Sequence, residues 1–585
     1  MKLTNYASQA PWVALMISHA HSALIPRAFD VGQAVTTTSG IIQGHAAADR
    51  AEVSEYLGIP YAQPPIGDLR FAAPEPFLSN SSFTAGSYGL MCMRNAASAN
   101  YSMLTAAGYN LTPGAEEYLN TIQGQGNDMG EDCLTLNVWT KPQVGEKTKA
   151  VLLFIHGGGF QGGSSHNAYL TGQHIADEED VVVVSINYRT NVFGFPGLQP
   201  SVANVAPNAG LLDQRLAVEW ARDNVAAFGG DPTRITLFGQ SAGSTSISTY
   251  GYAYASDPIA HGFITQSGTA DSFGTPTPNS TASFQALAVL LGCSNTTTTT
   301  PEALSAAAAC IRAQPADSVL AAIAQIPATT STLGTFAPTA DGTTAFPDYA
   351  PLTSAGAFAA VPRLHGSDAD DGNSFALDFA LLGLVLPRAY WAWHTLAFFG
   401  CPTAAEAEGM AVARDPDMPS WRYIYVADYP NLRLTVNPSL GAYHGAELNP
   451  LFGTSEALGG KDTPAEAATG RYMRSAWAAF AKDPSSGLSG EDFGWPTLPV
   501  GDEAEAEAQT VLLGLGNSTT AVFEASSVRD SACPSVNGVL EAIGGIGGLY
   551  MLALVLAPAL EGIEDGDVIA VGEAILAVAS QYAGK

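Results

Sequence analysis

Three segments of the chain are almost continuously apolar and rich in β-branched residues, and each has the length of a single strand. They are Val151–Ile155, Val181–Asn187 and Ile235–Phe238. Runs of this kind are typical of strands that are buried on both faces of a parallel sheet. Each run is followed by a glycine-containing loop and a segment with helical periodicity. This alternation predicts an α/β fold, with a mainly parallel central sheet and helices on both faces.

The N-terminal end of the chain has an apolar segment of a different kind. Ala10–Ser18 is apolar and follows the basic residue Lys2. The small residues Ala20 and Ala23 offer cleavage points, so we expect residues 1–23 to be a signal peptide and the protein to be secreted.

The C-terminal end contains the apolar, uncharged run Ala542–Leu560, which is long enough for a membrane span. The run also contains Pro558 and several glycines, and no Lys or Arg lies between Arg529 and Lys585 to orient it. We therefore expect residues 536–585 to be an apolar appendage outside the main domain. Its role, and any association with a membrane, stay open.

Composition narrows the range of partners. Hydrophobic residues make up 46% of the 585 residues, which is enough for a large core. Charged residues are only 13%, and the formal net charge is −30. Because there is no basic stripe to neutralise phosphates, the sequence argues against nucleic acid as a partner.

The strand-like run Ile235–Phe238 leads directly into Gly239-Gln-Ser-Ala-Gly243. A Gly-x-Ser-x-Gly sequence between a strand and a helix forms a tight turn that holds the serine at the C-terminal end of the strand. The flanking glycines are needed because the turn has no room for side chains there. A helix-compatible run follows, so we interpret Ser241 as a nucleophile and not as part of a purely structural turn.

A second glycine motif, His156-Gly-Gly-Gly-Phe160, follows the run Val151–Ile155. Consecutive glycines expose backbone N–H groups, and such donors stabilise the oxyanion that forms during ester hydrolysis. We expect the oxyanion hole to consist of the N–H groups of Gly158, Gly159 and Ala242. A flexible loop or a phosphate cradle is the alternative, but neither a Walker lysine nor a Gly-x-Gly-x-x-Gly spacing is present at this site.

Several motifs, taken in order along the chain, carry a family resemblance. They are Glu55–Phe71, Glu131–Val138, His156–Phe160, Asn208–Gln214 and Phe228–Pro232. With them the chain resembles the type-B carboxylesterase/lipase family, which includes the cholinesterases and fungal lipases, over about residues 35–535. The resemblance implies an α/β-hydrolase fold for residues 24–535. Gln240, where many members have Glu, is more similar to the secreted fungal branch.

The order of catalytic residues in α/β-hydrolases is Ser, acid, His, so the base must follow Ser241. The histidines beyond it are His261, His365, His394 and His444. His444 lies in a glycine-flanked segment similar to the family's His-Gly-x-Glu, and this resemblance makes it the expected base. We expect His394, in an aromatic stretch, to be a partly buried helix residue, and His261 and His365 to be structural.

The acid is expected in the segment Gly366–Gly372, which resembles the family's Gly-x-x-x-Asp-Glu-Gly. This register aligns Asp371 with the catalytic glutamate of the family, although Asp is shorter by one methylene. Asp370 and Asp368 are the alternatives, and Asp368 fits a solvated acidic turn best. The acid would accept a hydrogen bond from His444 and fix its tautomer.

Six cysteines, an even number, indicate an oxidising compartment. The family resemblance selects the pairs Cys92–Cys133, Cys293–Cys310 and Cys401–Cys533. Asn-x-Ser/Thr sequons fit a secreted glycoprotein, and they begin at Asn80, Asn100, Asn110, Asn279, Asn295 and Asn517.

The Cys92–Cys133 bridge would close a long loop. Within it Tyr101–Tyr109 offers apolar and aromatic groups, whereas Glu116, Glu117 and Asp128 are charged. We expect this loop to be either a mobile flap over the site or a fixed, glycosylated surface loop.

These motifs together predict a carboxylic-ester hydrolase that forms an acyl-enzyme and uses neither a metal nor a cofactor. The expected substrate is a small-molecule or lipid ester that is uncharged and has a substantial apolar group. The alternative is a catalytically inactive binding or adhesion module on the same fold, as neuroligins resemble cholinesterases. The presence of Ser241, His444 and an acid candidate favours the enzyme.

Overall fold

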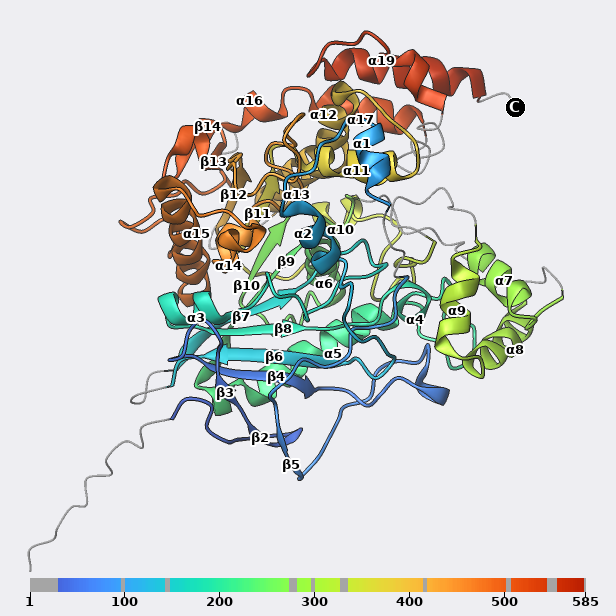
Figure 1. Cartoon of the computed structure of the whole chain (residues 1–585), viewed down its shortest axis with the longest axis vertical. Coiled ribbons are helices and arrows are strands. Elements are labelled where there is room, and N and C mark those ends of the chain that lie inside the picture. Colours follow the sequence, from blue (N-terminus) through green and yellow to red (C-terminus); the bar gives the residue numbers. More distant parts are fainter. Residues whose placement is uncertain are drawn as a thin grey trace, which may run out of the picture.

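A mixed β-sheet is the centre of the molecule in the computed structural model, which describes residues 30–95, 100–142, 148–272, 281–295, 300–326, 335–413, 418–500, 507–543 and 555–582 (Figure 1). Within these residues the sheet has 11 strands in the order β14-β13-β12-β11-β10-β9-β7-β8-β6-β4-β3. From β13 to β8 in this order, neighbouring strands are parallel, and antiparallel strands extend the sheet at both edges. The expected signal peptide, residues 1–23, lies outside the described residues.

The strands have the following bounds in the structure: β3 His45–Ala46, β4 Ser54–Pro60, β6 Thr135–Thr140, β7 Lys149–Ile155, β8 Val182–Ile186, β9 Gly230–Gln240, β10 Gly262–Gln266, β11 Arg363–Asp368, β12 Ser420–Tyr425, β13 Gln509–Leu513 and β14 Val522–Ala525. A small separate sheet consists of β1 Val35–Thr37, β2 Gly40–Gln43 and β5 Ser82–Thr84. The three strands expected from the apolar runs are thus β7, β8 and β9.

Both faces of the central strands are buried, which explains their continuous apolar sequence. In β7 the side chains of Val151, Leu153 and Ile155 belong to one hydrophobic core, and those of Leu152 and Phe154 belong to a second core. Side chains alternate between the faces of a sheet, so the two cores lie on opposite faces. The expected α/β architecture with helices on both faces is confirmed.

The helices that surround the sheet have these bounds: α1 Ser102–Ala106, α2 Ala115–Ile122, α3 Gln173–Glu179, α4 Asn191–Gly194, α5 Ala209–Asn224, α6 Ala242–Ala253, α7 Thr281–Leu290, α8 Pro301–Arg312, α9 Ala316–Ile323, α10 Ala350–Ser354, α11 Phe375–Leu381, α12 Arg388–Thr395, α13 Cys401–Val412, α14 Leu448–Phe452, α15 Pro464–Lys482, α16 Ser526–Asp530, α17 Cys533–Ala542 and α19 Val568–Tyr582. Helices α7, α8 and α9 pack together at one side of the sheet, as Figure 1 shows.

Three disulfides join the cysteine pairs that the resemblance implied, which are Cys92–Cys133, Cys293–Cys310 and Cys401–Cys533. The last of these links α13 to α17 and so ties the C-terminal region to the body of the fold. In the oxidising setting that the sequence indicates, such a bridge restricts the unfolded chain and so stabilises the fold.

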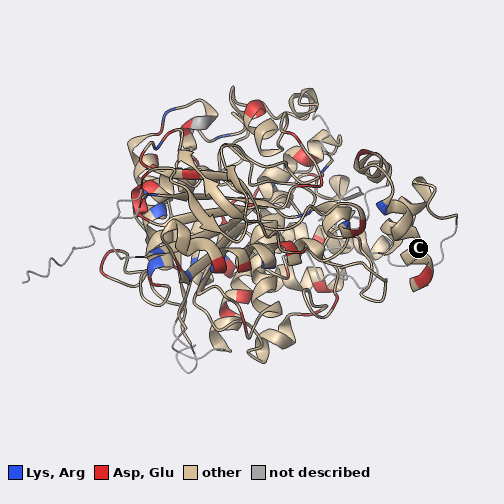
Figure 2. Cartoon of the chain, turned by 90° about the horizontal axis from the view of Figure 1, so that it is seen from below, with Lys and Arg blue, Asp and Glu red and all other residues tan. Residues whose placement is uncertain are grey.

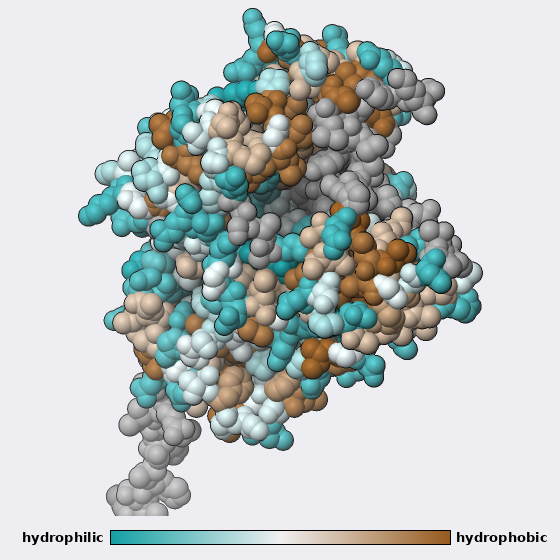
Figure 3. All heavy atoms as spheres, turned by 45° about the vertical axis from the view of Figure 1, so that its right-hand side comes forward, coloured by the Kyte–Doolittle hydropathy of each residue, from teal (hydrophilic) through white to brown (hydrophobic). Residues whose placement is uncertain are grey.

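The C-terminal segment packs on the body through α19. Helix α19 contacts α12 and α17, and its residues Val571, Ile575 and Val578 are buried in the same core as the sheet residue Phe154. Residues 544–554, which are most of the apolar run, lie outside the described residues. None of the described helices is long and apolar enough to span a membrane. Figure 3 shows apolar side chains at the surface near the top of the molecule, where Figure 1 places α19.

A buried group of charged side chains lies between the sheet and α13. Arg363 and His365 of β11 and Glu406 of α13 form it, and the Nδ1 atom of His365 is 3.5 Å from the Oε1 atom of Glu406. The hydroxyl of Ser248 donates a hydrogen bond to Glu406. Burial raises the pKa of Glu406 from its ordinary 4.5 to about 7, and Arg363 and Ser248 oppose this rise only in part. His365 therefore has a structural environment, as expected.

The protonated form of Glu406 gives the stability of the fold a specific pH dependence. Between its ordinary pKa of 4.5 and its native pKa of about 7, the folded protein keeps a proton that the unfolded chain has lost. The contribution is therefore complete below pH 4.5 and is lost as the pH rises to about 7. We expect Glu406→Gln to have a free energy of unfolding that falls less steeply over this range than that of the wild type. Denaturant titrations at several pH values measure both slopes.

The exposed residue Glu302 on α8 supplies the control, because Glu302→Gln should leave the wild-type slope unchanged. Equal slopes for wild type and Glu406→Gln would show that the Glu406 carboxyl is already ionised at pH 5.

Candidate active site

The turn after β9 forces Ser241 into a strained conformation. Ser241 has φ 59° and ψ −124°, between the end of β9 and the start of α6. A Cβ atom at Gly243 would lie 2.0 Å from the backbone oxygen of Ile155, and one at Gly239 would lie 2.8 Å from the same oxygen. Only glycine fits at these two positions, and a non-glycine residue at positive φ is held there by its surroundings. The expected tight turn is therefore present, with Ser241 at its apex.

The glycine loop after β7 lies against this turn. A Cβ atom at Gly157 would be 2.9 Å from the Cβ of Ser241, and Gly158 and Gly159 have φ values of 111° and 58°. These backbone conformations favour glycine because other residues lose stability at positive φ. The loop therefore brings its backbone N–H groups to the same edge of the sheet as Ser241 and Ala242.

His156 anchors the start of the glycine loop. Its ring stacks on Tyr188 with the ring centroids 4.4 Å apart, and its Nδ1 atom is 2.8 Å from the backbone oxygen of Gly157. Burial lowers the pKa of His156 to about 4, so the ring is neutral near pH 7 and donates this hydrogen bond. His156 thus holds the loop in place.

Asp371 and His444 are in direct contact. The Nδ1 atom of His444 donates a hydrogen bond to the Oδ1 atom of Asp371 at 2.6 Å. The other carboxylate oxygen, Oδ2, accepts hydrogen bonds from the hydroxyl of Ser267 at 3.0 Å and from the N–H of Asp368 at 2.9 Å. Asp371 is fully buried, and these donors fix its orientation.

The two alternative acids hold the backbone around His444. The Oδ2 atom of Asp370 accepts a hydrogen bond from the N–H of Ala442 at 3.1 Å. The Oδ2 atom of Asp368 accepts one from the N–H of Gly445 at 2.9 Å. The expectation that Asp368 lies in a solvated turn is wrong, because this residue is the last of β11 and the His444 segment covers its carboxyl group, which is only 2% exposed.

A second buried carboxyl group lies beside Asp368. Glu447 is fully buried, and its Oε1 atom accepts a hydrogen bond from the Nε2 atom of Gln266 at 2.9 Å. Burial raises the pKa of Asp368 well above its ordinary range, and the neighbouring carboxylates of Glu447 and Asp371 raise it further. Burial also raises the pKa of Glu447. A proton held between Asp368 and Glu447 removes one negative charge from the surroundings of the Asp371–His444 pair.

Gln240 contacts the other nitrogen of the His444 ring. Its Nε2 atom is 3.1 Å from the Nε2 atom of His444. The Gln240 amide donates, so the ring nitrogen accepts with its lone pair, in agreement with a proton on Nδ1. His444 therefore has its proton on Nδ1, and its Nε2 lone pair faces Gln240.

A cavity of about 600 Å³ opens onto these groups. Ser241 and His444 lie on its wall, together with Gly158 and Gly159. Much of the rest of the wall is apolar and aromatic, and it includes Tyr118, Leu119, Phe154, Tyr169, Phe375 and Leu448. A pocket of this kind admits a drug-sized organic molecule.

Two ionisable side chains that the sequence analysis did not single out line the same cavity, Arg94 and Asp378. Asp378 lies on α11 and is exposed. No sequence motif marks either residue. Ser267 and Glu447 were also missed, although Ser267 follows a strand and Glu447 ends the His-Gly-x-Glu segment.

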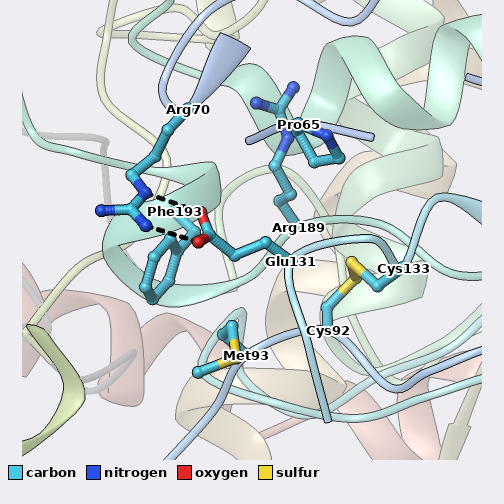
Figure 4. A pocket seen from close by; sticks show the side chains of 8 residues that line it. All are labelled: Pro65, Arg70, Cys92, Met93, Glu131, Cys133, Arg189 and Phe193. Atoms are coloured by element: carbon cyan, nitrogen blue, oxygen red, sulfur yellow. Dashed lines mark hydrogen bonds and ion pairs between the residues drawn. A yellow bond between two sulfur atoms is a disulfide. The ribbon is translucent and has the colours of Figure 1, made fainter. Parts of the chain in front are cut away.

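The loop closed by Cys92–Cys133 has a fixed base. Figure 4 shows Arg70 and Glu131 facing each other beside the disulfide. The Nε atom of Arg70 donates to the Oε1 atom of Glu131 at 2.6 Å. Within the loop α2 lines the cavity, whereas α1, part of the segment expected to form a flap, packs against α11 with Leu104 fully buried. The described part of the loop thus forms one wall of the cavity.

Comparison with known proteins agrees with this architecture. The model of the carboxylesterase family matches residues 32–381, which is more than half of the chain, so the protein belongs to this family of ester hydrolases. The chain is 32% identical over 508 residues to a chlorogenic acid esterase of Aspergillus niger, with 83% of this chain and 93% of the relative covered. It is 31% identical over 540 residues to secreted lipase 5 of Gibberella zeae, with 85% and 93% covered.

Solved structures give the same result for the fold. The chain resembles a PNB esterase with a TM-score of 0.67 and 26% sequence identity, and the similarity covers 86% of this chain and 100% of that structure. The α/β-hydrolase fold is therefore confirmed.

The contacts of the acidic residues predict which carboxylate supports ester hydrolysis. Asp371→Asn should lower kcat by roughly 10⁴-fold, because an amide cannot hold the His444 ring in the same tautomer. Asp370→Asn should have a much smaller effect, since this side chain contacts the backbone of Ala442 and not the ring. Steady-state kinetics with an activated ester measure both effects. A large loss in Asp370→Asn with wild-type kinetics in Asp371→Asn would move the role to the neighbouring residue.

Proposed function

We propose that this protein is a serine carboxylesterase with Ser241 as nucleophile, His444 as general base and Asp371 as the acid that orients His444. The observation that carries the proposal is the 2.6 Å contact between Nδ1 of His444 and Oδ1 of Asp371, on a cavity wall shared with Ser241. The strained turn and the loop of positive-φ glycines support it. An inactive binding module would not need a nucleophile, a base and an acid beside a glycine loop. The alternative from the sequence is therefore disfavoured.

The reaction divides into acylation and deacylation. The Oγ atom of Ser241 attacks the carbonyl carbon of the ester while its proton passes to Nε2 of His444. The oxyanion accepts hydrogen bonds from the N–H groups of Gly158, Gly159 and Ala242. When the intermediate collapses, the bond to the alcohol oxygen breaks and His444 protonates the leaving alcohol. Water then attacks the acyl-enzyme with His444 as base, and the carboxylic acid leaves as Ser241 regains its proton.

The substrate that best fits the cavity is an ester with a substantial apolar acyl or alcohol group. Aromatic rings of Tyr118, Phe154, Tyr169 and Phe375 line about 600 Å³ of space next to Ser241. Two relatives carry names of ester hydrolases, a chlorogenic acid esterase and a secreted lipase. We place this activity in residues 24–535.

We also propose that the protein is secreted. The expected signal peptide, the three disulfides and a secreted relative support this location. Sequon asparagines within the described residues are exposed, as glycosylation requires, at Asn80, Asn100, Asn110, Asn295 and Asn517. Asn279 lies outside the described residues.

The nucleophile and base are tested by removing them singly and together. Ser241→Ala and His444→Ala should each reduce ester cleavage by at least roughly 10⁴-fold, and the double variant should lose little more, because the two residues act as a unit. Thermal unfolding of each variant checks that the fold is intact. If folded Ser241→Ala kept wild-type turnover, the proposed mechanism would be wrong.

The size of the apolar group is tested with a series of 4-nitrophenyl esters of increasing acyl chain length. We expect kcat/KM to rise from acetate to medium chains, because longer chains bury more apolar surface in the cavity. Rates measured below and above substrate solubility separate two modes of action. A jump when droplets form indicates a lipase, and smooth saturation on soluble esters indicates an esterase.

A further inference from the structure

Arg94 is a buried cation without a partner on the wall of the catalytic cavity. Its side chain and backbone are only 7% exposed, and it lines the same cavity as Ser241. Its Nε and Nη2 atoms make no hydrogen bond with any described residue. Burial lowers the pKa of Arg94, and no neighbouring carboxylate opposes this effect among the residues that the structure describes. Arginine stays protonated in proteins, so the cavity contains an uncompensated positive charge.

Four other buried arginines of the described chain have carboxylate partners. The pairs are Arg70–Glu131, Arg189–Asp213, Arg422–Asp530 and Arg474–Glu178. A buried charge without a partner lowers stability, because the group has lost its hydration and gained nothing in return. Among the buried arginines of the described residues, Arg94 and Arg363 make no ion pair, and of these two only Arg94 lines the cavity with Ser241.

The backbone before Arg94 is anchored by two contacts. Cys92 is held in its disulfide with Cys133. The backbone oxygen of Met93 accepts a hydrogen bond from the Nδ2 atom of Asn191 at 2.6 Å. In the sequence after Asn95 the next four residues are Ala, Ala, Ser and Ala, none of which has a carboxylate. An anchored backbone lowers the cost of ordering this side chain around an anion.

The guanidinium lies beside the glycine loop and not beside His444. A Cβ atom at Gly162 would be 3.3 Å from the Cδ atom of Arg94, and one at Gly124 would be 3.5 Å from its Nη2 atom. At the His444 end the cavity has the carboxyl group of Asp378, an exposed residue of α11. The two ends of the cavity thus differ in charge, and the end near the glycine loop favours an anion.

We propose that Arg94 binds a carboxylate on the ester substrate, so that the enzyme prefers esters in which one half is a monoanionic carboxylic acid. A planar guanidinium matches a carboxylate with two parallel hydrogen bonds, and one cation balances one negative charge. Acidic residues are spread along the chain in Figure 2, with few basic residues between them, so recognition of an anion must be local. This inference rests on the proposed ester hydrolase and replaces the expectation of an uncharged substrate.

Two matched ester pairs test the proposal and identify the half that carries the carboxylate. On the alcohol side, the butyrate ester of 4-hydroxybenzoate is compared with that of 4-hydroxybenzamide. On the acyl side, the mono-4-nitrophenyl ester of adipic acid is compared with 4-nitrophenyl hexanoate. In Arg94→Gln, the ratio of kcat/KM for the anionic ester to that for the neutral ester should fall at least about tenfold in one pair. Arg94→Lys should recover part of that ratio.

Arg222→Gln is the matched control, because Arg222 lies exposed on α5 and this substitution also removes one positive charge. It should leave both ratios unchanged. Thermal unfolding adds a readout that separates recognition from structure, since removal of an unpaired buried charge should keep or raise Tm in Arg94→Gln. Equal ratios in the wild type and Arg94→Gln for both ester pairs, or a fall in Tm with a parallel loss on anionic and neutral esters, would overturn the proposal.

A binding measurement separates failure of this inference from failure of the proposed function. Benzoate and benzamide are titrated into wild type and Arg94→Gln by calorimetry, with no need for turnover. Benzoate should bind Arg94→Gln at least about tenfold more weakly than it binds the wild type, whereas benzamide should bind both proteins with equal affinity. If no ester is cleaved but benzoate binding depends on Arg94, the ester hydrolase is wrong and the anion site stands. If benzoate binds both proteins equally, the anion site is wrong.

Discussion

The close approach of two backbone segments at the C-terminal ends of β7 and β9 is the constraint on which the site depends. The backbone oxygen of Ile155 lies where a Cβ atom of Gly243 would be, and Gly157 lies against Ser241 in the same way. The chains meet at a distance that excludes side chains, so the serine and the glycine N–H groups are positioned by the backbone alone. Backbone groups in a sheet need no reorganisation during a reaction, which is the basis of electrostatic preorganisation.

The acid side of the site depends on a different interaction, the packing of several buried carboxyl groups against one another. Asp371 is fully buried, with Asp368 and Glu447 beside it. Three negative charges packed in this way would repel one another strongly. Raised pKa values at Asp368 and Glu447 resolve this, because a neutral carboxyl group donates a hydrogen bond where an ionised one repels. The backbone N–H of Gly445, held by Asp368, then fixes the segment that carries His444.

The sequence predicts those parts of the molecule that local constraints determine. The continuous apolar runs identify β7, β8 and β9, and glycine spacing identifies the two tight loops, since both patterns follow from backbone geometry. The burial of Asp368 is not predictable in this way, because it depends on the His444 segment, which lies far along the chain. The sequence does not predict the unpaired state of Arg94 for the same reason. Its lack of a partner results from the meeting of α2, the glycine loop and the disulfide, and none of these shares a sequence pattern with it.

Helix α19 gives the C-terminal segment a connection to the acid. Gly572 of α19 lies against Trp393 of α12. Thr395, which is also on α12, accepts with its hydroxyl oxygen a hydrogen bond from the N–H of Gly372, next to Asp371. A ribosome delivers Ser241, Asp371 and His444 well before it delivers α19. The support of the Asp371 turn is therefore completed only after residues near 580 have been synthesised and docked.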